Sequence, residues 1–321
     1  MKKNIRRAML AGAMMAGLAA AASHAAQPVR LVVAFPPGGP ADTLARVLAR
    51  ELADDLKESV IVENKPGANG AIAITYVMRG PADGSVLFLS SAGAIAINPS
   101  LYPSLPYKPL EDLAPISLVV HTPEVLVVAP GNPARSAADF VAASRQQAKP
   151  ANLASSGIGS MPHMAIELFK QQTKVGFLHV AYKGAAPAIS GTIGGHVDGF
   201  FGDVSGLMPF IGDKQLRAIG VAAPRRLKAL PDVPTLAEQG IPNVEASNWY
   251  GVFGPKGMSP ERVASLNAAV GRALTAKALV DNLATQGVEP TGSTPQAFRE
   301  LIQRDTEKWA KVIKDGKIKA E

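Results

Sequence analysis

Cysteine is absent from this chain of 321 residues, which excludes a disulfide framework, thiol chemistry and lipid attachment through an N-terminal cysteine. Aromatic residues make up only 5% of the chain and charged residues 18%, and the basic residues are scattered rather than grouped with aromatics. Because a nucleic-acid-binding surface needs such grouping, we expect no nucleic-acid partner. Stability has to come from a hydrophobic core, for which 47% apolar residues are ample.

Long apolar runs are also missing, except for one at the extreme N-terminus with the layout of a secretory signal. It covers residues 8–22, ends before Ser23-His24-Ala25 and follows four positive charges, Lys2, Lys3, Arg6 and Arg7. Its 15 residues fall short of the roughly 20 that a membrane anchor needs. We therefore expect a cleavable signal at residues 1–25, export to the periplasm and a mature net charge of +7 − 4 = +3.

Beyond this segment, short apolar stretches alternate with amphipathic helical patterns. Residues 28–35 form the first stretch, followed by a proline-glycine loop and a helix with Leu44, Leu48 and Leu52 on one face. We expect further strands at residues 60–63, 86–90, 152–155, 177–182, 199–201, 216–221 and 249–253, and helices at residues 71–78, 161–172 and 185–193. Ser259-Pro260 and Thr294-Pro295 each begin a further helix. The alternation predicts an α/β fold with a parallel sheet in each of two halves.

Four strand-to-helix loops combine small residues with few charges: Phe35–Asp42, Ser90–Asn98, Ser155–His163 and Tyr182–Pro187. In a parallel sheet such loops meet at the carboxyl ends of the strands, where ligands bind. The first three contain no arginine or lysine, so an anion there would bind to backbone N–H groups at helix N-termini, serine hydroxyls and His163. Simple turn chemistry and helix capping, for example by Asp42, explain any single loop equally well.

Motifs of catalytic chemistry are missing. Gly157-Ile-Gly159 precedes a helix, but Pro162 replaces the third glycine of a dinucleotide fingerprint. There is no G-x-S-x-G nucleophile elbow, and the histidines at positions 121, 163, 179 and 196 lack the local spacing of a helical zinc motif. We interpret Lys183 as a solvated surface lysine rather than a Schiff-base amine. We therefore expect neither enzyme activity nor a metal or other cofactor.

Eight motifs along nearly the whole mature chain resemble, in order and spacing, those of one family, the Bug proteins, which are periplasmic receptors of tripartite tricarboxylate transporters. The motifs are Phe35-Pro-Pro-Gly-Gly-Pro-Ala-Asp42, Glu63-Asn-Lys-Pro-Gly-Ala-Asn-Gly70, Ala82-Asp-Gly84, Asn98-Pro-Ser-Leu-Tyr102, Tyr182-Lys-Gly184, Gly194-Gly-His-Val-Asp198, Leu230-Pro-Asp-Val-Pro-Thr235 and Trp249-Tyr-Gly251. Each motif is weak alone, but eight in register are specific. The resemblance implies a two-lobed (Venus flytrap) periplasmic binding protein of α/β class, with two hinge-crossing strands and a small carboxylate between its lobes.

The same resemblance implies ligand loops at residues 35–42 and 90–93 in the first lobe, and at residues 155–163 and around Asp203 in the second. The candidate ligand-binding residues are Phe35, Pro37, Gly38, Gly39, Asp42, Ser91, Ala92, Gly93, Ser155, Gly159, Ser160, His163 and Asp203. This sequence departs from the family pattern at Pro40 and at Gly202-Asp203. Both departures concern the identity of the ligand rather than the fold.

From pattern and resemblance together, we expect lobe 1 to comprise residues 26–124 and 252–321, and lobe 2 residues 125–251. The expected function is capture of a small carboxylate, an organic, amino or aromatic acid, by a monomeric receptor that delivers it to the large and small membrane subunits of the transporter. Two other functions remain open. One is an exported enzyme acting on a carboxylate, and the other is a solute receptor for a signalling system.

Overall fold

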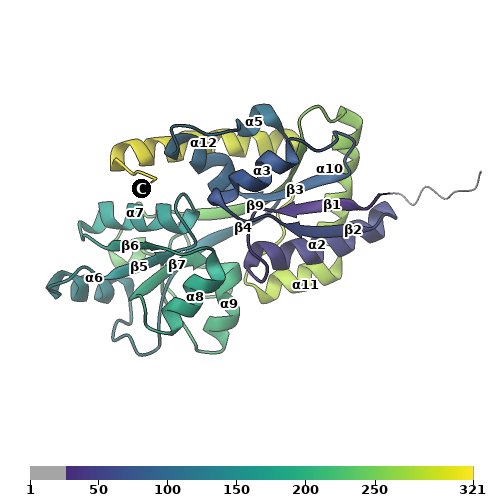
Figure 1. Cartoon of the computed structure of the whole chain (residues 1–321). Helices are drawn as coiled ribbons and strands as arrows, with labels where there is room; N and C mark the ends of the chain where they lie inside the picture. Colours follow the sequence, from purple (N-terminus) through teal and green to yellow (C-terminus); the bar gives the residue numbers. More distant parts are fainter. Residues whose placement is uncertain (1–26, 321) are drawn as a thin grey trace, which may run out of the picture.

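Nine β-strands form one hydrogen-bonded network in the part of the chain that the computed structural model describes, residues 27–320. The expected signal segment lies outside these residues. The strand order is β2-β1-β3-β9-β4-β7-β5-β6, with β8 paired to β4 (Figure 1). The strands are β1 (Val29–Val33), β2 (Val60–Asn64), β3 (Val86–Ser91), β4 (Leu113–Val128), β5 (Asn152–Ser155), β6 (Leu178–Ala181), β7 (Gly199–Asp203), β8 (Arg217–Val221) and β9 (Ser247–Pro255).

Helices cover both faces of this network. They are α2 (Pro40–Leu56), α3 (Ala71–Val77), α4 (Asn98–Leu101), α5 (Pro109–Asp112), α6 (Ala137–Gln146), α7 (Met161–Thr173), α8 (Ala185–Ile193), α9 (Val204–Gly212), α10 (Pro260–Thr275), α11 (Lys277–Thr285) and α12 (Pro295–Gly316), with short helical turns η1 (Ala68–Gly70), η2 (Gly93–Ile97) and η3 (Ala237–Gln239). Within the described range, no helix combines the length and the apolar character required to cross a membrane.

Lobe 1 is built on β1, β2 and β3, which run parallel; β9 pairs antiparallel with β3, and the first part of β4 pairs antiparallel with β9. Helix α2 packs on one face of this sheet because Leu44, Leu48 and Leu52, four residues apart, bury one stripe of the helix. Helices α10 and α11 pack beside α2, and α3 and α12 lie on the opposite face (Figure 1).

Lobe 2 is built on β7, β5 and β6, which run parallel, and on the second part of β4, which pairs antiparallel with β7 and β8. Helix α7 buries the predicted inward residues Met164, Leu168 and Phe169 against one face of this sheet. Helices α8 and α9 bury their apolar residues on the other face. Each lobe therefore has a three-layer core.

Two segments cross between the lobes. Strand β4 pairs with β9 up to Pro123 and with β7 from Glu124 onward, so that one strand belongs to both sheets. On the return, Ala246 still bonds to Ala222 of lobe 2, and β9 begins at the next residue. This arrangement confirms the predicted two-lobed α/β fold. The sequence predicted parallel sheets only, but β4 and β9 at the centre of the network pair antiparallel. They do so because the chain crosses to lobe 2 along β4 and returns to lobe 1 along β9.

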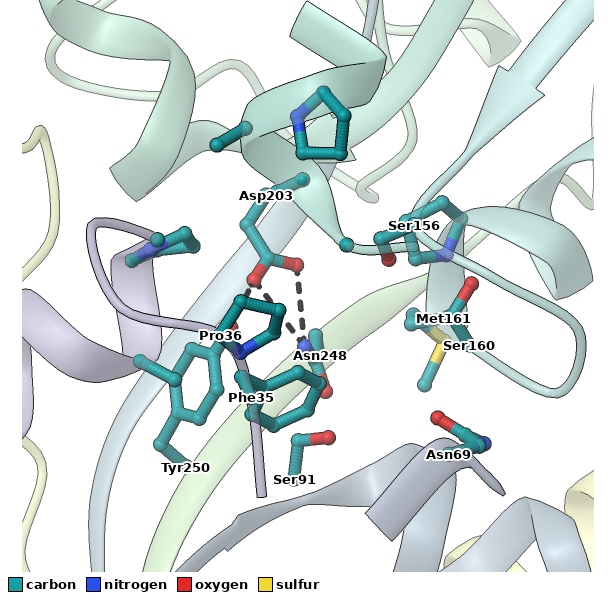
Figure 2. A pocket seen from close by; sticks show the side chains of 18 of the residues that line it. Phe35, Pro36, Asn69, Ser91, Ser156, Ser160, Met161, Asp203, Asn248 and Tyr250 are labelled. Atoms are coloured by element: carbon teal, nitrogen blue, oxygen red, sulfur yellow. Dashed lines mark hydrogen bonds between the residues drawn. The ribbon is translucent and has the colours of Figure 1, made fainter. Parts of the chain in front are cut away.

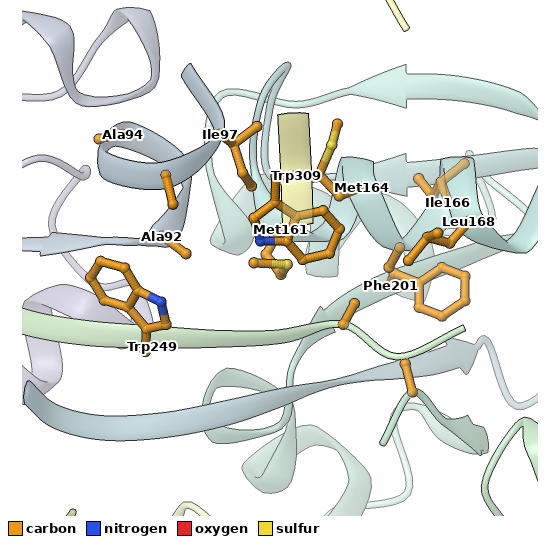
Figure 3. Close-up of a cluster of buried hydrophobic side chains, with 14 of the residues drawn as sticks. Ala92, Ala94, Ile97, Met161, Met164, Ile166, Leu168, Phe201, Trp249 and Trp309 are labelled. Atoms are coloured by element: carbon orange, nitrogen blue, oxygen red, sulfur yellow. The ribbon is translucent and has the colours of Figure 1, made fainter. Parts of the chain in front are cut away.

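Apolar side chains also connect the lobes away from the crossing segments. Trp309 of α12 lies beside Met161 and Met164 of α7 in one buried cluster (Figure 3). Helix α12 belongs to lobe 1 and α7 to lobe 2, so the lobes are in contact through these helices as well as through the crossing strands.

Candidate functional site

A pocket lies between the lobes, where loops of both meet near the crossing segments (Figure 2). Three kinds of residue line it: those of lobe 1 (Phe35, Pro36, Pro37, Gly39, Pro40, Ala41, Asn69 and Ser91), those of lobe 2 (Ser156, Ser160, Met161, Pro162, Gly184, Ala185, Ala186, Pro187, Phe200 and Asp203) and those of β9 (Asn248 and Tyr250). Among these described lining residues there is no arginine, lysine or histidine. A second hollow adjoins the first, and the exposed Lys183 lies at its edge.

In lobe 1, the loop after β1 is held by Asp42, a buried carboxylate in the first turn of α2. Its two oxygens accept hydrogen bonds from the Gly38 N–H at 3.0 Å, from Asn64 Nδ2 at 2.9 Å and from the Arg46 guanidinium at 2.9 and 3.0 Å. Burial alone would raise the pKa of Asp42, but these donors outweigh it and hold the pKa below its usual value. The loop is therefore braced by an ionised group.

In lobe 2, the loop after β5 is held by two neutral imidazoles. The rings of His163 and His179 stack with centroids 4.1 Å apart, Ser155 Oγ lies 2.6 Å from His179 Nε2, and the Gly159 N–H donates to His163 Nδ1 at 3.2 Å. Burial, with smaller effects from nearby positive groups, lowers the pKa of His163 to about 3 and that of His179 to about 4. Both rings are therefore uncharged at neutral pH.

Three helices begin at the pocket, and each has a proline in its first turn: α2, α7 and α8. The backbone N–H groups of Ala41, Met161, Ala185 and Ala186, all on the pocket lining, donate no hydrogen bond within the described residues. Such N–H groups, together with the positive end of the helix dipole, attract anions. The pocket can therefore bind an anion without a positively charged side chain.

One side of the pocket instead presents an acidic side chain. Asp203 directly precedes α9, its side chain makes no capping hydrogen bond to that helix, and it is 8% exposed. Its carboxylate accepts hydrogen bonds from Asn248 Nδ2 at 3.1 and 3.3 Å and from the Tyr250 hydroxyl. Burial raises the pKa of Asp203, although the hydrogen bonds oppose this shift. Burial also raises the pKa of Tyr250, and the neighbouring Asp203 carboxylate adds to that effect.

Of the predicted site residues, Phe35, Pro37, Gly39, Ser91, Ser160 and Asp203 line the pocket. The other seven lie outside the lining, namely Gly38, Asp42, Ala92, Gly93, Ser155, Gly159 and His163. Gly38, Asp42, Ser155 and His163 take part in the bracing of the loops, whereas Ala92 and Gly93 are buried at the start of η2.

Sequence reasoning missed three polar lining residues, Asn69, Asn248 and Tyr250. Asn69 is fixed by a 2.8 Å hydrogen bond from its Nδ2 to Asn98 Oδ1. Asn248 and Tyr250 are two residues apart on β9 and hence share a face of the strand. The available signal was an asparagine and a tyrosine alternating with apolar residues in a strand that is otherwise buried.

The lobes touch directly across the pocket. A Cβ on Gly159 of lobe 2 would lie 2.8 Å from Asn69 Nδ2 and 2.9 Å from Asn98 Oδ1, both of lobe 1. A Cβ on Gly184 would lie 3.4 Å from Pro36. The structure is thus the closed arrangement of the lobes, and Gly159 occupies a contact too tight for any side chain.

The fold and the interlobe pocket define the class of the protein, a two-lobed solute-binding protein. Residues 44–318 match the model of the family described as the tripartite tricarboxylate transporter family receptor. The chain belongs to this family, as its motifs predicted. Since the family is one of receptors, the assignment agrees with the expectation of no enzyme activity.

The relatives of this chain cover almost its whole length. It is 38% identical to protein BugT of Bordetella pertussis over 304 residues, which are 94% of this chain and 93% of BugT. An R. palustris protein solved with adipate has a TM-score of 0.88 at 32% identity, over 92% of this chain and 98% of that one. MatC from Rhodopseudomonas palustris with bound malate has a TM-score of 0.85 at 30% identity, over 90% and 99%.

Proposed function

We propose that this protein is a periplasmic receptor that captures a small organic carboxylate between its lobes and delivers it to the membrane subunits of a tripartite tricarboxylate transporter. The observation that carries the proposal is the convergence of three helix N-termini, with unpaired backbone N–H groups, on an interlobe pocket. Two structural neighbours were solved with adipate and with malate, which are carboxylates and support the same ligand class.

The proposal includes the organisation of the chain. A signal at residues 1–25 would be removed during export, and the monomeric mature protein would have lobe 1 at residues 26–124 and 252–321 and lobe 2 at residues 125–251. The change of strand partner at Glu124 supports the first boundary. Mass measurement of the protein recovered from periplasm tests the export step, since an intact Met1 there contradicts cleavage.

The ligand class is tested by thermal unfolding and calorimetry with small carboxylates, including adipate and malate. A ligand at about 100 times its dissociation constant stabilises the folded protein by roughly 2.7 kcal/mol, a shift of several degrees in Tm. A panel of carboxylates without any such shift contradicts the proposal.

A valine at Gly39 tests the position of the site. Gly39 lines the pocket and has φ −85° and ψ 173°, which any residue adopts, and a Cβ there would have only the Pro36 carbonyl oxygen nearby, at 3.8 Å. We expect Gly39→Val to fold normally and to lose binding because the side chain fills the pocket. Gly131→Val, on the exposed surface with open space around it, is the matched control and should bind as the wild type does.

Ser91→Ala tests the contribution of one hydroxyl. Ser91 lines the pocket and is buried, with 3% of its surface exposed. We expect this variant to weaken binding by only about 0.5 to 1.5 kcal/mol, the usual net value of one hydrogen bond. A complete loss of binding would place more of the recognition on side chains than on helix N-termini.

A further inference from the structure

The pocket contains a buried negative group without a positive partner. Asp203 is held by two neutral donors, Asn248 and Tyr250, and forms no ion pair within the described part of the chain. A buried carboxylate is costly unless a cation or several donors compensate it. Two donors leave part of its hydrogen-bonding capacity open on the side that faces the pocket.

The described neighbours of Asp203 supply one free amide acceptor and no cation. A carboxylate only accepts, so the Asn248 amide must turn its NH2 toward Asp203 and its oxygen away, and this buried Oδ1 has no partner among the described residues. Glu124, the cross-strand partner of Asp203, is fully buried, and neither of its oxygens is hydrogen-bonded there. Burial and the nearby Asp203 raise the pKa of Glu124 well above its usual value, so it is the member of the pair that keeps a proton.

The pocket therefore has two unlike sides. Within the described residues, the N-termini of α2, α7 and α8 supply unpaired donors, whereas Asn248 supplies an unpaired acceptor, its Oδ1, beside the Asp203 carboxylate, which can accept further hydrogen bonds. Figure 2 shows these two side chains facing the space opposite Ser156, Ser160 and Met161. A ligand that satisfies both sides needs an anionic end and a donor end.

We propose that the ligand is a small amino carboxylate, whose carboxylate binds at the helix N-termini and whose ammonium group binds between Asp203 and the Asn248 amide oxygen. This inference rests on the proposed function and narrows its ligand class. An ammonium neutralises Asp203 and donates up to three hydrogen bonds, whereas a hydroxyl supplies one donor without charge. A second carboxylate would meet Asp203 as a like charge.

The test uses calorimetry on the full mature protein to compare ligands that share the same carboxylate and spacer and differ in the other end group. One set is γ-aminobutyrate, γ-hydroxybutyrate, pentanoate and glutarate, and the other is alanine, lactate and isobutyrate. In the set that fits the pocket, we expect the amino compound to bind about tenfold or more tighter than its methyl counterpart, with the hydroxyl compound between them. Glutarate should bind more weakly than γ-aminobutyrate.

Asp203→Asn should reduce the preference for the amino compound to about threefold or less, while keeping the shape of the side chain. Glu124→Gln is the control, since it replaces a protonated carboxyl by a neutral amide, and should keep the wild-type order. The wild-type comparison stands without either variant, so poor folding of a variant does not block the test.

The outcomes separate the two proposals. Equal or tighter binding of pentanoate, isobutyrate or glutarate overturns the ammonium site and leaves carboxylate capture intact, and an unchanged order in Asp203→Asn does the same. Absence of binding by every carboxylate in both sets overturns the ammonium site together with the receptor function on which it rests.

Discussion

The two loops that face each other across the pocket have the same backbone layout, but one is held by a charged side chain and the other by uncharged side chains. In each, a strand leads into a loop with a glycine at positive φ, Gly38 at +82° and Gly159 at +77°, and then into a helix with proline in its first turn. The lobe 1 loop is held by the ionised Asp42, and the lobe 2 loop by the uncharged His163 and His179. One pocket is therefore formed by two surfaces that respond differently to acid and to substitution.

The two glycines should give the largest contrast. Alanine at either position adds backbone strain of about 1 kcal/mol. A Cβ at Gly38 meets nothing within 4 Å, whereas one at Gly159 collides with Asn69 and Asn98 of the other lobe. We expect Gly159→Ala to hold the lobes apart and to weaken binding about 100-fold, and Gly38→Ala to bind nearly as the wild type does.

Calorimetry gives the affinities of these two variants, and small-angle scattering gives the radius of gyration with and without ligand. The wild type and Gly38→Ala should contract when ligand is added, and Gly159→Ala should not. Equal effects of the two substitutions on affinity would show that strain, and not lobe contact, determines binding.

As pH falls, the stability contributed by His163 and His179, which hold the lobe 2 loop, should be lost first. The unfolded chain takes up protons near pH 6.5, whereas folded His179 and His163 do so only near pH 4 and pH 3. Between these values the unfolded state binds more protons, so the free energy of unfolding falls as pH drops below 6.5, by up to about 1.4 kcal/mol per pH unit for each histidine.

Urea unfolding at pH 7, 6 and 5 measures this loss. The double variant His163→Gln/His179→Gln should show a flatter dependence, and His196→Gln, at an exposed position, should keep the wild-type slope. Asp42 contributes nothing to the slope in this range, because its stabilisation is lost only as pH falls below the usual value near 3.8. An unchanged slope in the double variant would contradict the assignment.

The smallest of the three effects concerns Asp42, the ionised carboxylate that holds the lobe 1 loop. Asp42→Ala leaves the Gly38 N–H and the Asn64 amide without their acceptor, which should lower the free energy of unfolding by about 1 to 3 kcal/mol. Arg46→Ala removes only a half-exposed ion pair and should have little effect. If Asp42→Ala and Arg46→Ala lower the free energy of unfolding in urea by the same amount, the ion pair with Arg46, and not the hydrogen bonds from the loop, stabilises this region.

Local sequence signals predicted the elements that have clear starts and one apolar face. Ser259 and Thr294 cap α10 and α12 as expected, each accepting a hydrogen bond from the backbone three residues on. Helix α9 was missed because Pro209 and Gly206 argue against a helix, and α11 because it begins directly after α10 without a polar cap. Packing outweighs propensity in both.

The site was only partly predictable for a different reason. The loops and the positions Ser91, Ser160 and Asp203 follow from strand-to-helix connections, which are local. Asn248 reaches the pocket through the pairing of β9 with strands far apart in the sequence, and Asn69 lies in η1, where its side chain is fixed by Asn98, 29 residues on; no local pattern specifies either. The carboxylate of Asp42 faces its own loop because Gly38 and Asn64 offer donors there, a choice that spacing alone does not reveal.

The order in which the chain is made has a consequence for how the crossing strands assemble. Strand β9 lies between β3 and β4 in the network, yet it follows both by more than a hundred residues. A chain that emerges from a membrane N-terminus first can complete the sheet of lobe 2, whose strands β5 to β8 lie between β4 and β9, before β9 is present. The edges of β3 and β4 that pair with β9 lack their partner until then, so we expect this last insertion to be the slow, aggregation-prone step of folding.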